Sequence, residues 1–151
     1  MKIWVDADAC PGAVREIVLK AANRLVVHTT FVANKALFLP QAEHLYFVQV
    51  PAGPDVVDGY IIEQAITGDL VITQDIPLAA ELVNQGVVVI SPHGTLFTDG
   101  NIGDRLASRN LMSDLRDTGM ITGGPKPFGE KEKRAFANAF DQALTRLLRA
   151  T

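Results

Sequence analysis

Five short apolar runs alternate with stretches of helical periodicity over the first hundred residues, and this alternation constrains the fold more than any other feature. The runs cover residues 3–5, 25–32, 45–50, 70–73 and 87–90. Their length and β-branched content predict strands buried on both faces of a sheet. Helical segments follow three of them, at residues 11–22, 55–67 and 78–84. This order predicts βαβ units, and hence an α/β fold with a mostly parallel five-stranded sheet and helices on both faces.

The remaining third of the chain carries no strand pattern. Residues 101–118 predict a helix, the glycine- and proline-rich residues 119–129 predict a loop, and residues 130–149 predict a long amphipathic helix. A length of 151 residues is typical of one domain. We therefore expect a single domain, with an α/β core at 1–100 and a helical C-terminal extension at 101–151.

Cysteine content and hydropathy exclude several classes of protein. Cys10 is the single cysteine, so an internal disulfide and a cysteine-based zinc cage are both excluded. No apolar run approaches the ~18 residues of a membrane-spanning helix, and the start lacks the pattern of a signal peptide. We therefore expect a cytoplasmic protein with no membrane partner. Cys10 precedes a predicted helix, where a thiol can be activated, but a small buried residue is the favoured interpretation.

Acidic side chains gather at one edge of the predicted sheet. Asp6 and Asp8 follow the first strand, Asp55 and Asp58 open the helix after the third strand, and Asp75 follows the fourth. Because the carboxyl ends of parallel strands share one edge, we expect these acids to meet there. Carboxylate oxygens suit Mg²⁺ or Mn²⁺ and disfavour Zn²⁺. Such ions activate water and neutralise the charge on a reacting phosphodiester.

Each acid also has a purely structural interpretation. Asp55 and Asp75 stand just ahead of helices, where aspartate is a favoured N-cap worth ~1 kcal/mol. Asp58, in a first turn, complements the helix dipole, and Asp69, before the fourth strand, is expected to be a solvated turn residue. Asp6 is the hardest to explain in this way, because a carboxylate directly after a buried strand needs hydrogen-bond partners or a metal ion.

The formal charge of −3 is unevenly distributed. The first hundred residues carry 5 basic and 11 acidic side chains, whereas the remainder carries 9 basic and 6 acidic ones. Such a basic region can bind a polyanion, although basic residues also simply solvate helices. Arg105, Arg109 and Arg116 recur at roughly helical spacing, and we expect them to contact an RNA backbone. Thr73 and Gln74, at the sheet edge, are expected to hydrogen-bond a substrate phosphate or a metal-bound water.

Four motifs in the sequence resemble those of a known family. Residues 3–11, 53–58, 68–79 and 123–125 together resemble the bacterial YaiI/YqxD family, and the resemblance covers nearly the whole chain. The arrangement of sheet and acids in that family in turn resembles the PIN-like and NYN ribonuclease superfamily. This resemblance implies a PIN-like fold that cleaves RNA with a divalent metal ion.

The resemblance also implies a role for each acid. Asp6 matches the acid after the first strand, Asp55 or Asp58 the acid that opens the middle helix, and Asp75 the acid in the turn after the fourth strand. In this hypothesis Asp6, Asp75 and one or both of Asp55 and Asp58 hold Mg²⁺ or Mn²⁺. Asp8 orients the water shell of the metal ion and completes the expected catalytic set with Asp6 and Asp75.

Two other functions stay open on the sequence alone. The first is a haloacid dehalogenase-type phosphatase, with Asp6 as nucleophile, Asp8 as acid/base and Thr73 at the end of a second motif strand. It is disfavoured, because no lysine and no paired acids stand between Asp75 and Asp99. The second is a non-catalytic RNA-binding or regulatory module, which would keep the basic C-terminal helices and tolerate the loss of Asp6.

Overall fold

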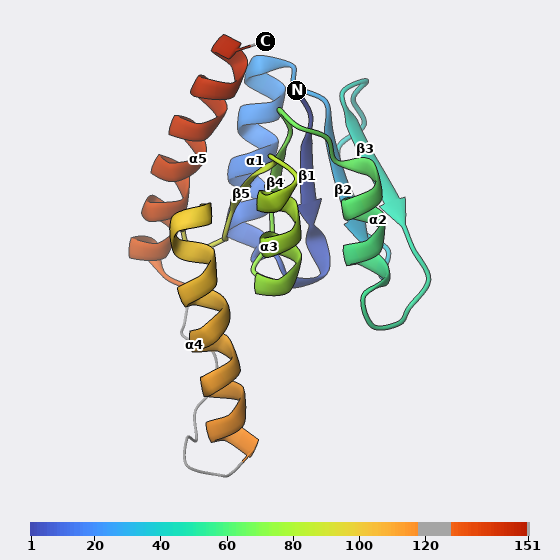
Figure 1. Cartoon of the computed structure of the whole chain (residues 1–151). Helices are drawn as coiled ribbons and strands as arrows, with labels where there is room; N and C mark the ends of the chain where they lie inside the picture. The colour runs from blue at the N-terminus through green and yellow to red at the C-terminus, as the bar shows by residue number, and fades with distance from the viewer. Residues whose placement is uncertain (118–127, 151) are drawn as a thin grey trace.

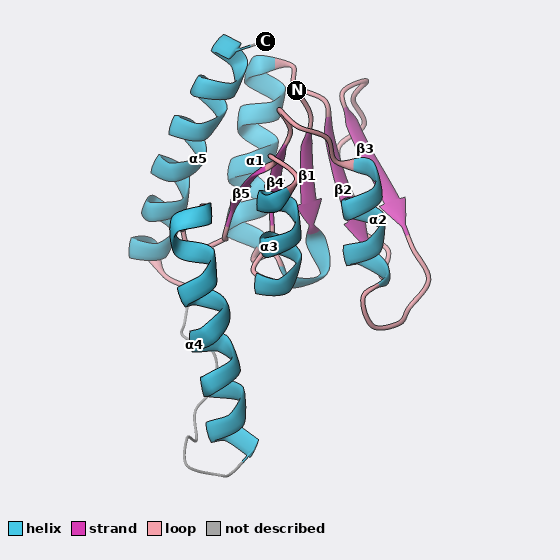
Figure 2. Cartoon of the chain, in the orientation of Figure 1, coloured by secondary structure: helices cyan, strands magenta, loops and turns pink. Residues whose placement is uncertain are grey.

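The structure, a computed structural model, describes residues 1–117 and 128–150. Its centre is a six-stranded sheet in the order β3-β2-β1-β4-β5-β6 (Figures 1 and 2). The strands are β1 (Ile3–Asp6), β2 (Thr29–Ala33), β3 (Leu45–Gln49), β4 (Leu70–Ile72), β5 (Val88–Ile90) and β6 (Leu96–Phe97). The first five are parallel, as predicted, and β6 is antiparallel to β5. The predicted count of five is one short, because β6 has two residues and is too short for a periodic signal.

Helices cover both faces of the sheet, as the sequence predicted (Figure 2). They are α1 (Gly12–Leu25), α2 (Val56–Gln64), α3 (Ile76–Asn84), α4 (Asp99–Asp117) and α5 (Glu130–Ala150), with a short 3₁₀ helix η1 (Ala7–Ala9) after β1. One face packs against α1 and α5, and the other against α2 and α3. Helix α4 starts beside α3 and runs past the carboxyl ends of the strands (Figure 1). The loop predicted at 119–129 lies largely outside the described residues.

The run at residues 25–32 holds the end of a helix as well as a strand. Leu25 is the last residue of α1, and Val26 caps that helix in a left-handed conformation with φ 52°. Strand β2 begins only at Thr29. The apolar content of this run is therefore shared between two elements, and hydrophobicity alone does not place the boundary between them.

Helix α5 belongs to the core of the fold. Helix α5 buries Phe136 and Phe140, whose stacked rings lie 5.4 Å apart, in the same cluster as Ile3 and Val5 of β1. It is therefore an integral layer of the α/β fold rather than an appendage to it.

No described helix is long and apolar enough to cross a membrane.

Asp69 is a structural residue and not the solvated turn residue that its position predicts. Its side chain is 2% exposed, at the amino ends of β1 and β4. It accepts hydrogen bonds from the backbone N of Lys2 (3.0 Å), from Trp4 Nε1 (3.0 Å) and from the backbone N of Ile66 (3.1 Å). A carboxylate can accept all three bonds at once. Asp69 therefore ties β1 to β4 and to the turn that precedes β4.

Replacing Asp69 with Asn is expected to destabilise the protein. An amide has one acceptor oxygen, so either the Lys2 bond or the Trp4 Nε1 and Ile66 bonds are lost, and a donor left unpaired costs about 1–3 kcal/mol. Urea unfolding followed by circular dichroism measures the loss. Asp104→Asn, which makes the same charge change at an exposed position, is expected to stay within about 0.5 kcal/mol of the wild type. Equal stability of the Asp69 variant and the wild type would contradict this role.

Gly94 allows α5 to approach the turn between β5 and β6. Its φ is +90°, and a Cβ atom at this position would lie 2.6 Å from the backbone carbonyl carbon and oxygen of Ala135 in α5. A side chain here is therefore strained by the backbone and by the contact.

Gly94→Ala is expected to lower the free energy of unfolding by about 2 kcal/mol or more, because both the positive φ and the overpacking oppose a methyl group. Thermal unfolding measures the effect. Gly103→Ala is the matched control, since a Cβ there meets nothing within 4 Å and alanine favours the helix. The close packing of α5 on this turn is refuted if the two variants unfold at the same temperature.

Candidate functional site

The strand order reverses between β1 and β4. From β1 the chain passes to β2 and β3 on one side, and from β4 it passes to β5 on the other. Open α/β sheets bind ligands at this point, outside the carboxyl ends of the strands. Asp6 is the last residue of β1 and Thr73 is the first residue after β4. Both lie at the expected binding edge.

A hydrogen bond joins these two residues across the reversal. Asp6 is 8% exposed and Thr73 is 1% exposed, and Thr73 Oγ1 donates to Asp6 Oδ2 over 2.8 Å. The same hydroxyl accepts from the backbone N of Asp75 at 3.0 Å. Thr73 therefore holds Asp6 in place, and its predicted contact with a substrate phosphate or a metal-bound water stays a prediction.

Helices α2 and α3 bring further acids to Asp6. Strand residues alternate between the two faces of a sheet, so Asp6 shares the face of Trp4, which packs with α2 and α3. Asp75 is the N-cap of α3, and its Oδ1 accepts from the backbone N of Leu78 at 3.0 Å. The N-cap interpretation of Asp75 is therefore confirmed, and a hydrogen bond also joins its side chain to that of Asp58.

Asp55 and Asp58 lie at the start of α2. Asp55 occupies the N-cap position in a left-handed conformation with φ 64°, and its side chain makes no capping hydrogen bond. The N-cap interpretation of Asp55 therefore does not hold. Both acids line a cleft of about 350 Å³ between α2 and α3, whose opposite wall includes Pro77 and Leu78.

The acids repel one another. Burial raises the pKa of Asp6 above its ordinary value, the hydrogen bond from Thr73 partly offsets this rise, and the charges of Asp75 and Asp8 add to it. Burial likewise raises the pKa of Asp58, to about 7, and the charges of Asp75, Asp6 and Asp55 and a hydrogen bond with Asp75 contribute. Asp6, Asp58 and Asp75 therefore share one electrostatic environment although they come from three separate segments.

A row of polar contacts continues from the acids along the carboxyl edge. Asp8 Oδ2 accepts from the backbone N of Asn34 at 2.8 Å, and Gln49 Nε2 donates to the backbone O of Asn34 at 3.3 Å. Gln74 Nε2 donates to the backbone O of Ala9 at 3.0 Å. Sequence analysis missed Asn34 and Gln49. They stand at the carboxyl ends of β2 and β3, so the rule that selected the acids would also have selected them.

The predicted basic residues all belong to α4. Arg105 is exposed on it. Arg109 and Arg116 lie further along the same helix, and their side chains are outside the described part of the chain. Their contacts with a nucleic acid stay a prediction.

The donor set suits a hard divalent cation, but it is not a closed metal cage. Among the described residues no group of three or more His, Cys, Asp or Glu side chains is arranged to hold a metal ion. The acids nevertheless offer only oxygen ligands, and within residues 1–108 and 128–150 no lysine or arginine forms an ion pair with them. The nearby thiol is a poor ligand, because burial raises the pKa of Cys10 to about 12.

Asp58→Asn is expected to stabilise the protein at pH 8. The pKa of Asp58 is about 7 in the folded chain, above the ordinary value, so the folded state keeps a proton that the unfolded state releases between about pH 4 and 7. Wild-type stability therefore falls as the pH rises through this range. The variant should gain on the order of 1 kcal/mol at pH 8 after solvent screening, and little at pH 4.

Thermal unfolding across this pH range measures the difference between the variant and the wild type. Glu63→Gln, at an exposed position of the same helix, is the control and is expected to show no such pH-dependent gain. A variant that is less stable than the wild type at pH 8 would contradict the raised pKa of Asp58.

Comparison with known proteins agrees with the motifs of the sequence. The model of the "Uncharacterized BCR, YaiI/YqxD family" matches residues 4–146. UPF0178 proteins of Myxococcus xanthus and Psychromonas ingrahamii are 55% and 52% identical to this chain over 149 and 151 residues. These alignments cover 99% and 100% of the chain, and 97% and 100% of the relatives. No solved structure matches. The chain belongs to the YaiI/YqxD family.

Proposed function

We propose that this protein is a PIN-like ribonuclease, related to the NYN group, that hydrolyses phosphodiester bonds in RNA with the help of Mg²⁺ or Mn²⁺. One observation carries the proposal. Asp6 ends β1, Asp58 lies in α2 and Asp75 caps α3; burial raises the pKa of Asp6 and of Asp58, and the charge of Asp75 adds to both rises. Clustered carboxylates of this kind are stabilised by a bound divalent cation.

The chain's own residues would prepare such a site. Asp6, Asp58 and Asp75 would hold the cation, with Asp55 at the rim of the cleft beside them. Thr73 fixes one oxygen of Asp6, and the backbone N of Leu78 fixes one oxygen of Asp75. When bound, the cation would activate water and neutralise charge on the phosphodiester. Asp58 would have to lose its proton, so binding should weaken below about pH 7.

The charge distribution supports RNA as the substrate class. The first hundred residues have an excess of 6 acidic side chains and the remainder an excess of 3 basic ones. Helix α4, with the exposed Arg105, runs past the same edge of the sheet that carries the acids (Figure 1). Arg105 would therefore offer a phosphate backbone a cationic contact on a helix that passes this edge.

Asp6→Asn is expected to abolish both metal binding and cleavage. Asparagine keeps the shape and can still accept from Thr73, but it removes the charge that attracts the cation. Mn²⁺ binding is measured by titration calorimetry. Cleavage is measured on end-labelled single-stranded RNA with Mg²⁺ or Mn²⁺, and with chelator as a blank. We expect a loss of rate on the order of 10²- to 10³-fold or more.

Asp104→Asn, purified in the same way, is the control and should cleave as the wild type does. If Asp6→Asn cleaves as fast as the wild type, the activity does not arise at this site and the proposal is wrong. If the wild type binds RNA but binds no Mn²⁺ at millimolar concentration, the proposal also fails, and the non-catalytic RNA-binding module takes its place.

A further inference from the structure

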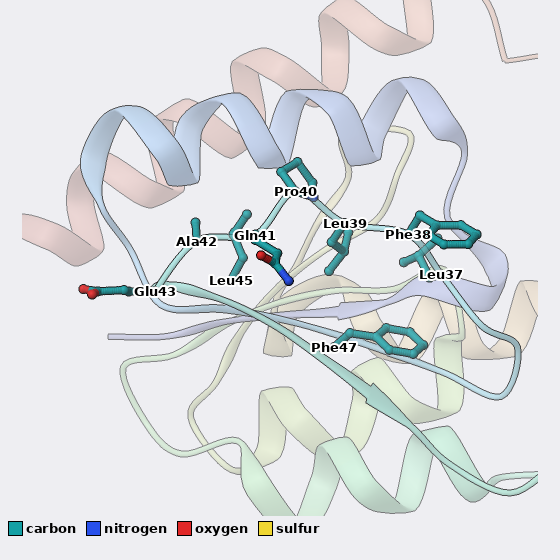
Figure 3. Close-up of a pocket in the computed structure, with 9 residues that line it drawn as sticks. All are labelled: Leu37, Phe38, Leu39, Pro40, Gln41, Ala42, Glu43, Leu45 and Phe47. Atoms are coloured by element: carbon teal, nitrogen blue, oxygen red, sulfur yellow. The ribbon is translucent and has the colours of Figure 1, made fainter.

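Phe38 is a fully exposed aromatic residue beside an apolar groove. Its side chain is 100% exposed, on the irregular connection at residues 34–44 between β2 and β3. The groove, of about 690 Å³, is lined by this connection and by the start of β3, including Leu39 and Phe47 (Figure 3). A parallel crossover usually places a helix here. Phe38 is thus one of several apolar residues that line the same groove, unlike the isolated exposed residues that are common on proteins.

The start of this connection is fixed next to the acids. The backbone N of Asn34 donates to Asp8 Oδ2, and the backbone O of Asn34 accepts from Gln49. Asp8 is two residues from Asp6. Phe38 follows Asn34 by four residues, so their Cα atoms are at most about 14 Å apart even in a fully extended chain. This is a span of only a few nucleotides of single-stranded RNA.

The charges along the groove favour a polyanion at one end of it. Lys35 is exposed between Asn34 and Phe38. The exposed Glu43 lies at the opposite end of the groove from Phe38 (Figure 3). Lys35 would attract a phosphate and Glu43 would repel one, so the end that carries Phe38 is the more favourable end of the groove for a nucleic acid, with the Asp8 carboxylate behind Asn34.

We propose that Phe38 is a stacking platform for an unpaired base of an RNA strand, whose neighbouring phosphate is held by Lys35. This inference rests on the proposed function: the strand would pass from the groove, on the α1 side of the sheet, over the carboxyl edge beside Asp8 to the acids on the side of α2 and α3. Aromatic rings next to a basic residue are the usual means of holding a single strand without reading its sequence. A duplex keeps both faces of its bases stacked, so this site selects single-stranded RNA.

Fluorescence anisotropy with a labelled oligouridylate, in chelator so that no cleavage occurs, tests the proposal. Phe38→Ala is expected to weaken binding roughly 5- to 150-fold, the range seen when one stacking residue is lost. Phe38→Tyr should bind as the wild type does, and Phe38→Leu should be as weak as Phe38→Ala. An oligomer of abasic ribose phosphates should bind the wild type and Phe38→Ala equally. Since the ring is fully exposed, thermal unfolding should not distinguish these variants.

Other results would overturn the inference and leave the proposed function to its own test. Equal binding of oligouridylate by Phe38→Ala and the wild type would exclude stacking. Full binding by Phe38→Leu would point to a merely apolar contact. A wild type that sediments as a dimer and a Phe38→Ala variant that sediments as a monomer would assign the surface to a second copy of the chain. Conversely, Phe38-dependent binding together with full cleavage by Asp6→Asn would support the platform and refute the nuclease site.

Discussion

The hydrogen bond from Thr73 to Asp6 is the contact on which the arrangement of the acids depends. A carboxylate that is 8% exposed at the end of a buried strand is tolerated only if it has a partner. Thr73 supplies that partner, and the backbone N of Asp75 orients the Thr73 hydroxyl in turn. The contact therefore fixes the carboxyl ends of β1 and β4 and the start of α3 relative to one another. Asp58, from α2, then completes the group.

The opposite edge of the same strand pair is held in a related way. Asp69 accepts three hydrogen bonds at the amino ends of β1 and β4, two of them from Lys2 and Trp4 of the first strand region. The central pair of strands is thus fixed at both ends by buried carboxylates with quite different surroundings. Asp69 is surrounded by donors, whereas Asp6 has one donor among the described residues and lies near other acids. This contrast distinguishes a structural carboxylate from a candidate functional one.

The positions of the elements and of the acids could be read from the sequence because both depend on local pattern. Alternating strands and helices predicted the parallel sheet, and the end-of-strand rule selected Asp6 and Asp75. Local pattern did not predict the features that depend on which residues become buried. Asp69 was predicted to be a turn residue because two of its three donors, the backbone N of Lys2 and Trp4 Nε1, come from a distant segment. Strand β6, of two residues, also depends on contacts between residues distant in the sequence. The same holds for the packing of α5 on the core, where Gly94 allows the backbone of α5 to lie close to the turn after β5.

By itself, the sequence determined the α/β class, the family and the set of acids, since periodicity, motif and residue type are properties of the chain alone. The tertiary structure decided what each side chain does. In the folded chain the hydroxyl of Thr73 donates to Asp6, and Asp75 caps α3. Asp8 accepts from the backbone N of Asn34, and Phe38 is exposed to solvent. These roles are set by the partners that folding brings within hydrogen-bond distance, and by the burial that raises the energy of each charge.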